Sequence, residues 1–219
     1  MLLLALSMFL QAAVAVQSVL VRTFDDDKIG APPPGFTLAT GREAASEGWT
    51  VRREGAARVL VHEGRHSPPD GFAVAILSAS QYHDVQVSVR FKATGGSRTA
   101  GLVWKYQDPL NHYSAQLDLA KQELAMYRVV NGNRIRLERE DDLELDPEAW
   151  HALKIFQENG EIRVYLGGIR VLHERDRQPR AGASVGIWVG GDSTVMFDDF
   201  RVEDETEHAP KAVPAAPKP

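Results

Sequence analysis

The sequence predicts an all-β protein, an antiparallel two-sheet β-sandwich of the jelly-roll type. Short apolar or alternating segments recur along the chain, turn residues bound most of them, and no segment has convincing helical periodicity. The clearest run is residues 100–137, which form a series of strands separated by short polar turns. A meander of this kind needs a second layer to cover its apolar face. Two facing sheets are therefore expected.

In the first half of the chain, residues 84–92 have the clearest period-two pattern. Val85, Val87 and Val89 alternate with polar residues, so one face of this strand must be wet. Residues 72–77, FAVAIL, are apolar on both faces, which favours a central strand. The strands expected here are 19–21, 36–39, 49–51, 57–62, 72–77 and 84–92.

Turn chemistry organises the second half of the chain. Asn131-Gly132 and Asn159-Gly160 are hairpin signals, because both residue types tolerate the positive φ of a type I′ turn. Phe197 and Phe200 are out of phase, which predicts a bulge in the last strand. The strands expected here are 101–107, 112–119, 124–130, 134–137, 150–157, 161–166, 169–173, 183–189 and 194–202, with a charged connection at 138–148.

Composition narrows the classes of function. The chain has 219 residues, 43% of them hydrophobic, and a net charge of -5. This mild acidic balance and the lack of a long Lys/Arg cluster argue against a nucleic-acid partner. The chain has no cysteine, which excludes disulfides and thiolate metal sites.

The two ends of the chain differ from its middle. Residues 1–17 are apolar with small residues at Ala13 and Ala15, which predicts a secretory signal peptide. The run is shorter than a spanning helix needs, so we expect an exported protein, periplasmic or extracellular, without stable membrane insertion after cleavage; a permanent anchor is the alternative. Residues 204–219 are rich in proline and predict a disordered tail. A single domain is expected over 18–203.

Several strand and turn motifs together resemble a known superfamily. These are GLVWKYQDPLNHYSAQLD, YRVVNG, WHALKIF, IRVYLGG, ASVGIWV and FDDFRV. They look like the concanavalin A-like, laminin-G-like β-sandwich superfamily, and are most similar to secreted domains related to 3-keto-disaccharide hydrolases, often labelled family-16-like. The resemblance spans about residues 20–203. It implies a fold that serves lectins, carbohydrate-binding modules and glycosidases alike, so fold alone does not choose among them.

A sugar-binding surface is the leading functional prediction. Aromatic rings stack on pyranoses, while amides and carboxylates hold the hydroxyls. Trp104 and Tyr106 are expected on one strand face, with polar residues just downstream. The alternative is that Trp104, Tyr113 and Trp188 pack in the core. The predicted carbohydrate-binding residues are Trp104, Tyr106, Asn111, Tyr113, Gln116, Asp118, Arg128 and Trp188.

The prediction of a bound metal ion rests on fewer observations than that of a sugar-binding surface. The resemblance implies a structural calcium ion between the terminal strands, held by Asp198 and by Asp25 from the acidic stretch near the start. The alternative is a bulged strand with solvated acids. The histidines lack the spacing of a zinc site, and no cofactor is required by any motif.

Catalysis is the alternative function. Glu144, Asp146 and Glu148 match the E-x-D-x-E spacing of family-16 glucanases, but Pro147 disfavours a central strand and favours a surface turn. By analogy with 3-keto-disaccharide hydrolases, an acid and base would come from His83, His112, Asp118 and Glu138. We therefore predict an exported, non-catalytic carbohydrate-binding domain; a glycoside hydrolase or lyase, or a structural domain of the cell envelope, are the alternatives.

Overall fold

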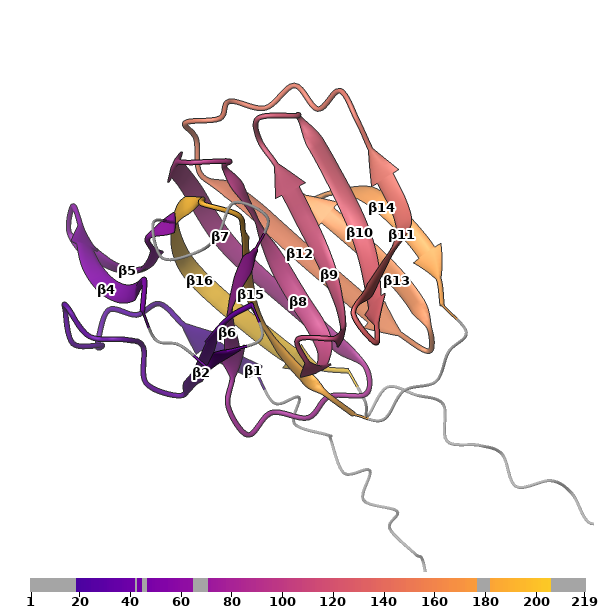
Figure 1. Cartoon of the computed structure of the whole chain (residues 1–219), viewed down its shortest axis with the longest axis horizontal. Coiled ribbons are helices and arrows are strands. Elements are labelled where there is room, and N and C mark those ends of the chain that lie inside the picture. The colour runs from indigo at the N-terminus through magenta and orange to yellow at the C-terminus, as the bar shows by residue number, and fades with distance from the viewer. Residues whose placement is uncertain (1–18, 42, 45–46, 65–70, 177–181, 206–219) are drawn as a thin grey trace, which may run out of the picture.

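Alternating apolar and polar residues build two antiparallel sheets of eight strands each, which lie face to face (Figure 1). The computed structural model describes residues 19–41, 43–44, 47–64, 71–176 and 182–205. No helix long and apolar enough to cross a membrane occurs in these ranges. The predicted signal peptide, and the predicted tail beyond Glu205, lie outside the described residues.

Sheet A is the rear layer in Figure 1, and its central strands are β7, β12 and β16. Its order is β14 (Ile169–Arg175), β13 (Glu161–Leu166), β12 (His151–Glu158), β7 (Val85–Gly95), β16 (Thr194–Asp204), β5 (Ala57–His62) and β4 (Trp49–Glu54), and β1 (Val19–Arg22) also pairs with β16.

Sheet B is the front layer in Figure 1. Its order is β11 (Asn133–Glu140), β10 (Glu123–Val130), β9 (Asn111–Asp118), β8 (Thr99–Asp108), β15 (Ser184–Gly190), β6 (Phe72–Leu77), β2 (Phe36–Thr40) and β3 (Glu43–Ala44).

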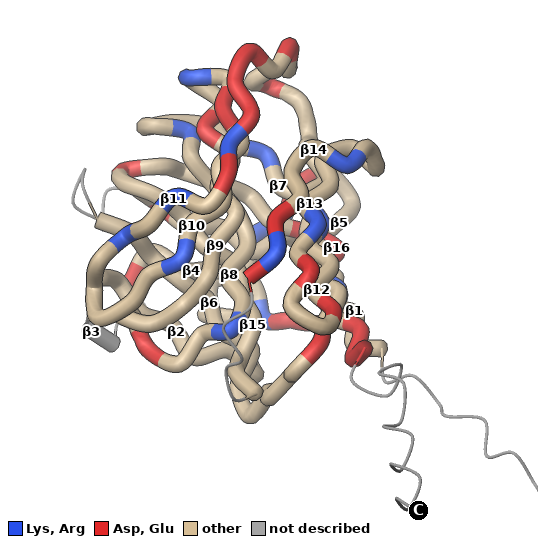
Figure 2. Tube along the Cα trace, turned by 90° about the vertical axis from the view of Figure 1, so that its right-hand side faces the viewer, with Lys and Arg blue, Asp and Glu red and all other residues tan. Residues whose placement is uncertain are grey.

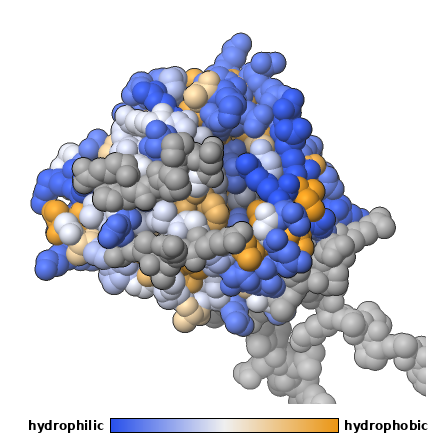
Figure 3. Space-filling model, in the orientation of Figure 1, coloured by the Kyte–Doolittle hydropathy of each residue, from blue (hydrophilic) through white to orange (hydrophobic). Residues whose placement is uncertain are grey.

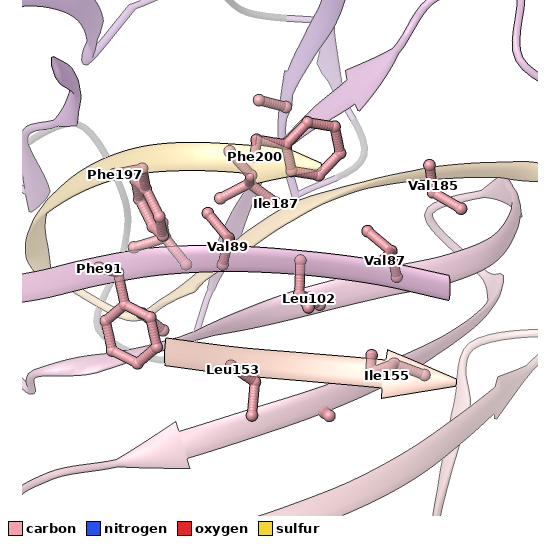
Figure 4. Packing of buried hydrophobic residues seen from close by; sticks show 14 of the residues in the cluster. Val87, Val89, Phe91, Leu102, Leu153, Ile155, Val185, Ile187, Phe197 and Phe200 are labelled. Atoms are coloured by element: carbon pink, nitrogen blue, oxygen red, sulfur yellow. The ribbon is translucent and has the colours of Figure 1, made fainter. Parts of the chain in front are cut away.

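The core lies between the inner faces of the two sheets. Figure 4 shows Val87 and Val89 of β7 and Leu102 of β8 pointing into this layer. All three side chains are fully buried, as the period-two pattern predicts. One buried hydrogen bond crosses the layer, because Nε1 of Trp104 donates to Oε1 of Gln157 at 2.6 Å.

The predicted turns are confirmed by the backbone. Asn131 and Gly132 have φ of 50° and 81°, and Asn159 and Gly160 have φ of 49° and 80°. These positive angles at both central positions are those that a type I′ hairpin requires. The two asparagine-glycine pairs therefore set the β10–β11 and β12–β13 hairpins.

The predicted bulge in the last strand is also confirmed. The register of β16 against β7 shifts between Asp198 and Arg201, and Asp199 has φ of 50°. The extra residue lets Phe197 and Phe200 both face the core, where neither is exposed. Beyond the bulge, the neighbour of β16 changes from β5 to β1.

Charged, polar and apolar residues are mixed over the visible surface. Figure 2 shows basic and acidic residues intermingled along the visible strands. Figure 3 shows hydrophobic residues in small separate patches among hydrophilic ones on the viewed side. Most large apolar side chains lie instead in the interior cluster.

Candidate functional site

A cleft of about 650 Å³ lies on the outer face of sheet B. Antiparallel register aligns outward-facing residues of neighbouring strands in rows that cross the sheet. One row runs Gly190, Thr99, Asp118 and Glu123 across β15, β8, β9 and β10, and the next runs Trp188, Gly101, Gln116 and Ala125 across the same strands. Glycine and alanine in these rows keep the floor of the cleft low.

Trp188 and Phe72 form an apolar wall at one side of the cleft. Their rings stack with centroids 6.3 Å apart and an interplanar angle of 16°. A Cβ atom on Gly190 would lie only 2.5 Å from Cη2 of Trp188, so the indole occupies the space above that glycine. Any larger residue at position 190 would displace this wall.

Gln116, Tyr127 and Arg134 form the opposite, polar wall. Nη2 of Arg134 donates to Oε1 of Gln116 at 2.5 Å, and Nε2 of Gln116 donates to Oγ of Ser114 at 2.8 Å. The guanidinium carbon of Arg134 lies 3.5 Å from the centroid of the Tyr127 ring, a close cation–π contact. These contacts fix the amide and the guanidinium in place before any ligand arrives.

Asp118 lines the cleft but is engaged by its own turn. Its Oδ1 accepts hydrogen bonds from the backbone N–H groups of Ala120 and Lys121, and its Oδ2 lies 2.6 Å from Nζ of Lys121. The hydrogen bond that Lys121 donates to Asp118 raises the pKa of Lys121. Asp118 therefore shapes the rim more than it offers a free carboxylate.

His112 closes one end of the cleft. Its ring centroid lies 5.9 Å from those of both Phe72 and Tyr106. The side chain is 2% exposed, and burial lowers its pKa. Its Nδ1 has no hydrogen-bond partner among the described residues. The imidazole is thus neutral at neutral pH.

Three of the predicted sugar-binding residues meet at this cleft. Gln116, Asp118 and Trp188 line it, although Trp188 is only 7% exposed. Tyr106 packs beside them against the small apolar cluster that contains Val103 and Trp188. These residues remain candidates for contact with a ligand.

The prediction that Trp104 and Tyr113 face a ligand is wrong. Trp104 is fully buried and bonded to Gln157, and Tyr113 is 1% exposed and donates from its hydroxyl to Asp176. A bulge between Trp104 and Asp108, where Lys105 has φ of 46°, breaks the alternation. Trp104 therefore points inward and Tyr106 outward, and the two do not share a face.

Arg128 and Asn111 also have other partners. Nη1 of Arg128 pairs with Asp176 at 3.1 Å, next to the hydroxyl of Tyr113. Asn111 donates to both carboxylate oxygens of Asp108, and its Oδ1 accepts from the backbone of Asn131. Neither residue lines the cleft, and both hold neighbouring segments together.

Sequence reasoning missed Phe72, Thr99, Ala125, Tyr127 and Arg134, which all line the cleft. One available signal was the Asn131-Gly132 hairpin, because it pairs Val129 with Arg134 and so brings Arg134 back beside the β10 face that carries Tyr127. The contribution of Phe72 had no comparable signal, since its strand is apolar throughout.

The predicted acid and base residues do not converge. His112 and Asp118 line the cleft, but Glu138 accepts a hydrogen bond from the backbone of His173 on β14, and His83 lies against Gly182. The segment with Glu144, Asp146 and Glu148 is a turn, as predicted: Oδ1 of Asp146 accepts from the backbone of Glu148, whose side chain is 61% exposed.

The two predicted calcium ligands lie near one another without forming a cluster. Oδ1 of Asp25 accepts from the backbone of Arg58. Burial raises the pKa of Asp198, to which the charges of Asp199 and Asp25 add. No group of three or more metal-ligating His, Asp or Glu side chains occurs in the described ranges. Calcium at Asp25 and Asp198 stays a prediction.

No protein-family profile matches the sequence, and no curated protein matches it either. Solved structures share its fold. The carbohydrate-binding module CBM66 from Bacillus subtilis is similar with a TM-score of 0.58 and 17% identity, over 77% of this chain and 96% of that one. Domain 4 of AbnA, an extracellular arabinanase from Geobacillus stearothermophilus, solved in complex with arabinotriose, has a TM-score of 0.59 and 15% identity, over 86% of this chain and 93% of that one.

A β-1,3-1,4-glucanase (lichenase) derived from a mouse hindgut metagenome also shares the fold, with a TM-score of 0.54 and 12% identity over 85% of this chain and 99% of that one. These similarities define the class of the protein as a β-sandwich shared with carbohydrate-binding modules, which confirms the predicted fold class. At such low identity they establish the fold alone. The narrower resemblance to 3-keto-disaccharide hydrolases stays a prediction.

Proposed function

We propose that this chain is a carbohydrate-binding β-sandwich domain, and that its ligand lies in the cleft on the outer face of sheet B. The observation that carries the proposal is the cleft's composition: an apolar wall of Trp188 and Phe72 faces a preorganised polar wall of Gln116 and Arg134. A sugar presents apolar C–H faces and hydroxyl edges, and this pair of walls is complementary to both.

Binding without catalysis fits the cleft better than hydrolysis. Retaining glycosidases need two carboxyl groups about 5 Å apart with one of them free to attack. Of the two cleft carboxylates, Asp118 is held by Lys121 and its turn, and Glu123 lies 3.5 Å from Nη1 of Arg139. Both carboxylates are therefore paired with basic side chains, which supports a non-catalytic role. Export through residues 1–17 is part of the same proposal.

The test is saccharide binding by a variant whose cleft is filled. Ala125 lies on the floor, so Ala125→Leu would place a larger apolar side chain where the sugar is expected. We expect the dissociation constant for any saccharide that binds the unaltered protein to rise at least roughly tenfold, measured by isothermal titration calorimetry over an oligosaccharide panel.

The matched control is Ala152→Leu, because Ala152 is an exposed strand residue of β12 on the other sheet. This variant should bind as the unaltered protein does. Equal binding by the Ala125→Leu and Ala152→Leu variants, both folded, would show that the sugar lies elsewhere.

A further inference from the structure

We propose that the saccharide in this cleft carries a carboxylate, as in a uronic acid, and that the guanidinium of Arg134 binds it. The inference rests on the proposed function and specifies its ligand. A guanidinium group can donate two parallel hydrogen bonds to the two oxygens of a carboxylate. This planar, bidentate geometry makes the interaction both strong and specific in orientation.

Arg134 is held in the cleft by neutral partners. Its Nη2 donates to the amide oxygen of Gln116, and its plane lies over the ring of Tyr127. It forms no ion pair with a carboxylate anywhere in the described part of the chain. The side chain is exposed, so the donors not used by Gln116 remain accessible to a ligand.

The other charged residues of the cleft are already neutralised in pairs. Lys121 lies 2.6 Å from Asp118, and Glu123 lies 3.5 Å from Arg139. Among the charged side chains that line the cleft, Arg134 is therefore the one with no oppositely charged side chain beside it in the described part of the chain. An anionic ligand group would supply that charge, whereas a neutral sugar would leave it unmatched.

The position of Arg134 gives the ligand an orientation. Asp118 and Glu123 share one row of the sheet, whereas Arg134 pairs with Val129 further along β10, at the end of the cleft that His112 closes. Burial lowers the pKa of His112, and the charge of Arg134 lowers it further, so His112 adds no second cation there. The carboxylate would therefore point toward Arg134, and the hydroxyls toward Gln116 and Thr99.

The experiment compares acidic oligosaccharides with matched neutral forms. The probes are oligomers of galacturonate, glucuronate and mannuronate, each paired with its methyl ester, and calorimetry measures binding to the full chain. We expect at least one acidic probe to bind roughly tenfold or more tightly than its ester. Arg134→Gln should bring the two forms to equal affinity, while Arg134→Lys should keep part of the preference.

The matched control is Arg170→Gln, because Arg170 is an exposed arginine on edge strand β14 of the other sheet; this change should leave the preference intact. Equal affinity for acid and ester, or a preference that survives Arg134→Gln, would overturn the assignment of a uronate while leaving carbohydrate binding in place. Failure of every acidic and neutral saccharide to bind would overturn both the uronate and the proposed function.

Discussion

Two polar side chains that line the cleft on the outer face of sheet B are buried. His112 and Gln116 are 2% and 7% exposed, and each lies in the cleft. Gln116 satisfies its amide through Ser114 and Arg134, whereas Nδ1 of His112 has no partner among the described residues. Burying a polar group without a partner costs stability. Polar residues that are buried at such a cost are characteristic of binding sites.

The state of His112 leads to a prediction about pH. Because the folded pKa lies below the unfolded value of about 6.5, the unfolded chain binds more protons as the pH falls through that value. This difference in proton binding leaves the stability unaffected above about pH 6.5 and lowers it as the pH falls toward the folded pKa of His112. Replacing His112 with Phe should therefore reduce the loss of unfolding free energy between about pH 7.5 and about pH 5.5.

Urea denaturation at the two pH values measures this difference. Tyr106→Phe is the matched control, because it alters the neighbouring ring but removes a hydroxyl whose pKa of about 12 lies outside the range tested. A His112→Phe variant with the same pH dependence as the unaltered protein would contradict the account of a buried neutral imidazole.

At the scale of elements, positive-φ turns join neighbouring strands within each sheet. Gly167 and Gly168, with φ of 58° and 85°, join β13 to β14. Nothing lies within 4 Å of a Cβ placed on Gly168, so a side chain there meets no obstacle except its own backbone. This position isolates the conformational contribution of a turn glycine.

We expect Gly168→Ala to lower the free energy of unfolding by about 1 kcal/mol, because an L-residue is strained in the left-handed region. Gly95→Ala is the matched control: Gly95 has no positive φ, and its added Cβ would meet only the side chain of Thr194, at 3.8 Å. That change should be neutral or slightly stabilising. Chemical denaturation of both variants checks the prediction, and equal effects would contradict it.

Strands were predictable wherever local pattern determines them. The segments 57–62, 72–77 and 161–166 were predicted with the bounds they have, because alternation or a continuous apolar run ends there at turn residues. β3, with two residues, carries too little pattern to be recognised, and the end of β11 at Glu140 was placed too early because its residues are charged. Pairing across the sheet, rather than residue type, extends that strand.

The site was predictable only in part, for a related reason. Alternation placed Gln116 and Asp118 on the outer face correctly, since β9 is regular from Asn111 to Asp118. It failed at Trp104 because a local bulge in β8 reverses the direction of the next side chains. Arg134 was missed because it enters the cleft through cross-strand contact with Tyr127 and Gln116.

At the scale of the molecule, stability and binding depend on different faces of the two sheets. Sheet A and the inner face of sheet B bury one continuous apolar cluster, in which Trp104 and Gln157 link the layers. The outer face of sheet B carries the cleft, with its apolar and polar walls on strands of the same sheet. A rigid sheet holds these side chains in a fixed arrangement, which lowers the entropic cost of binding a flexible sugar.

The central claim is that a saccharide occupies the outer face of sheet B. Amide chemical shifts of the isotope-labelled protein, recorded while the tightest-binding saccharide of the panel is added, test it most directly. We predict that the largest shifts occur at Thr99, Gln116, Ala125 and Gly190, with little change on the outer face of β7 and β12. Shifts that centre on β7 and β12, or no shifts with any saccharide, would contradict the account.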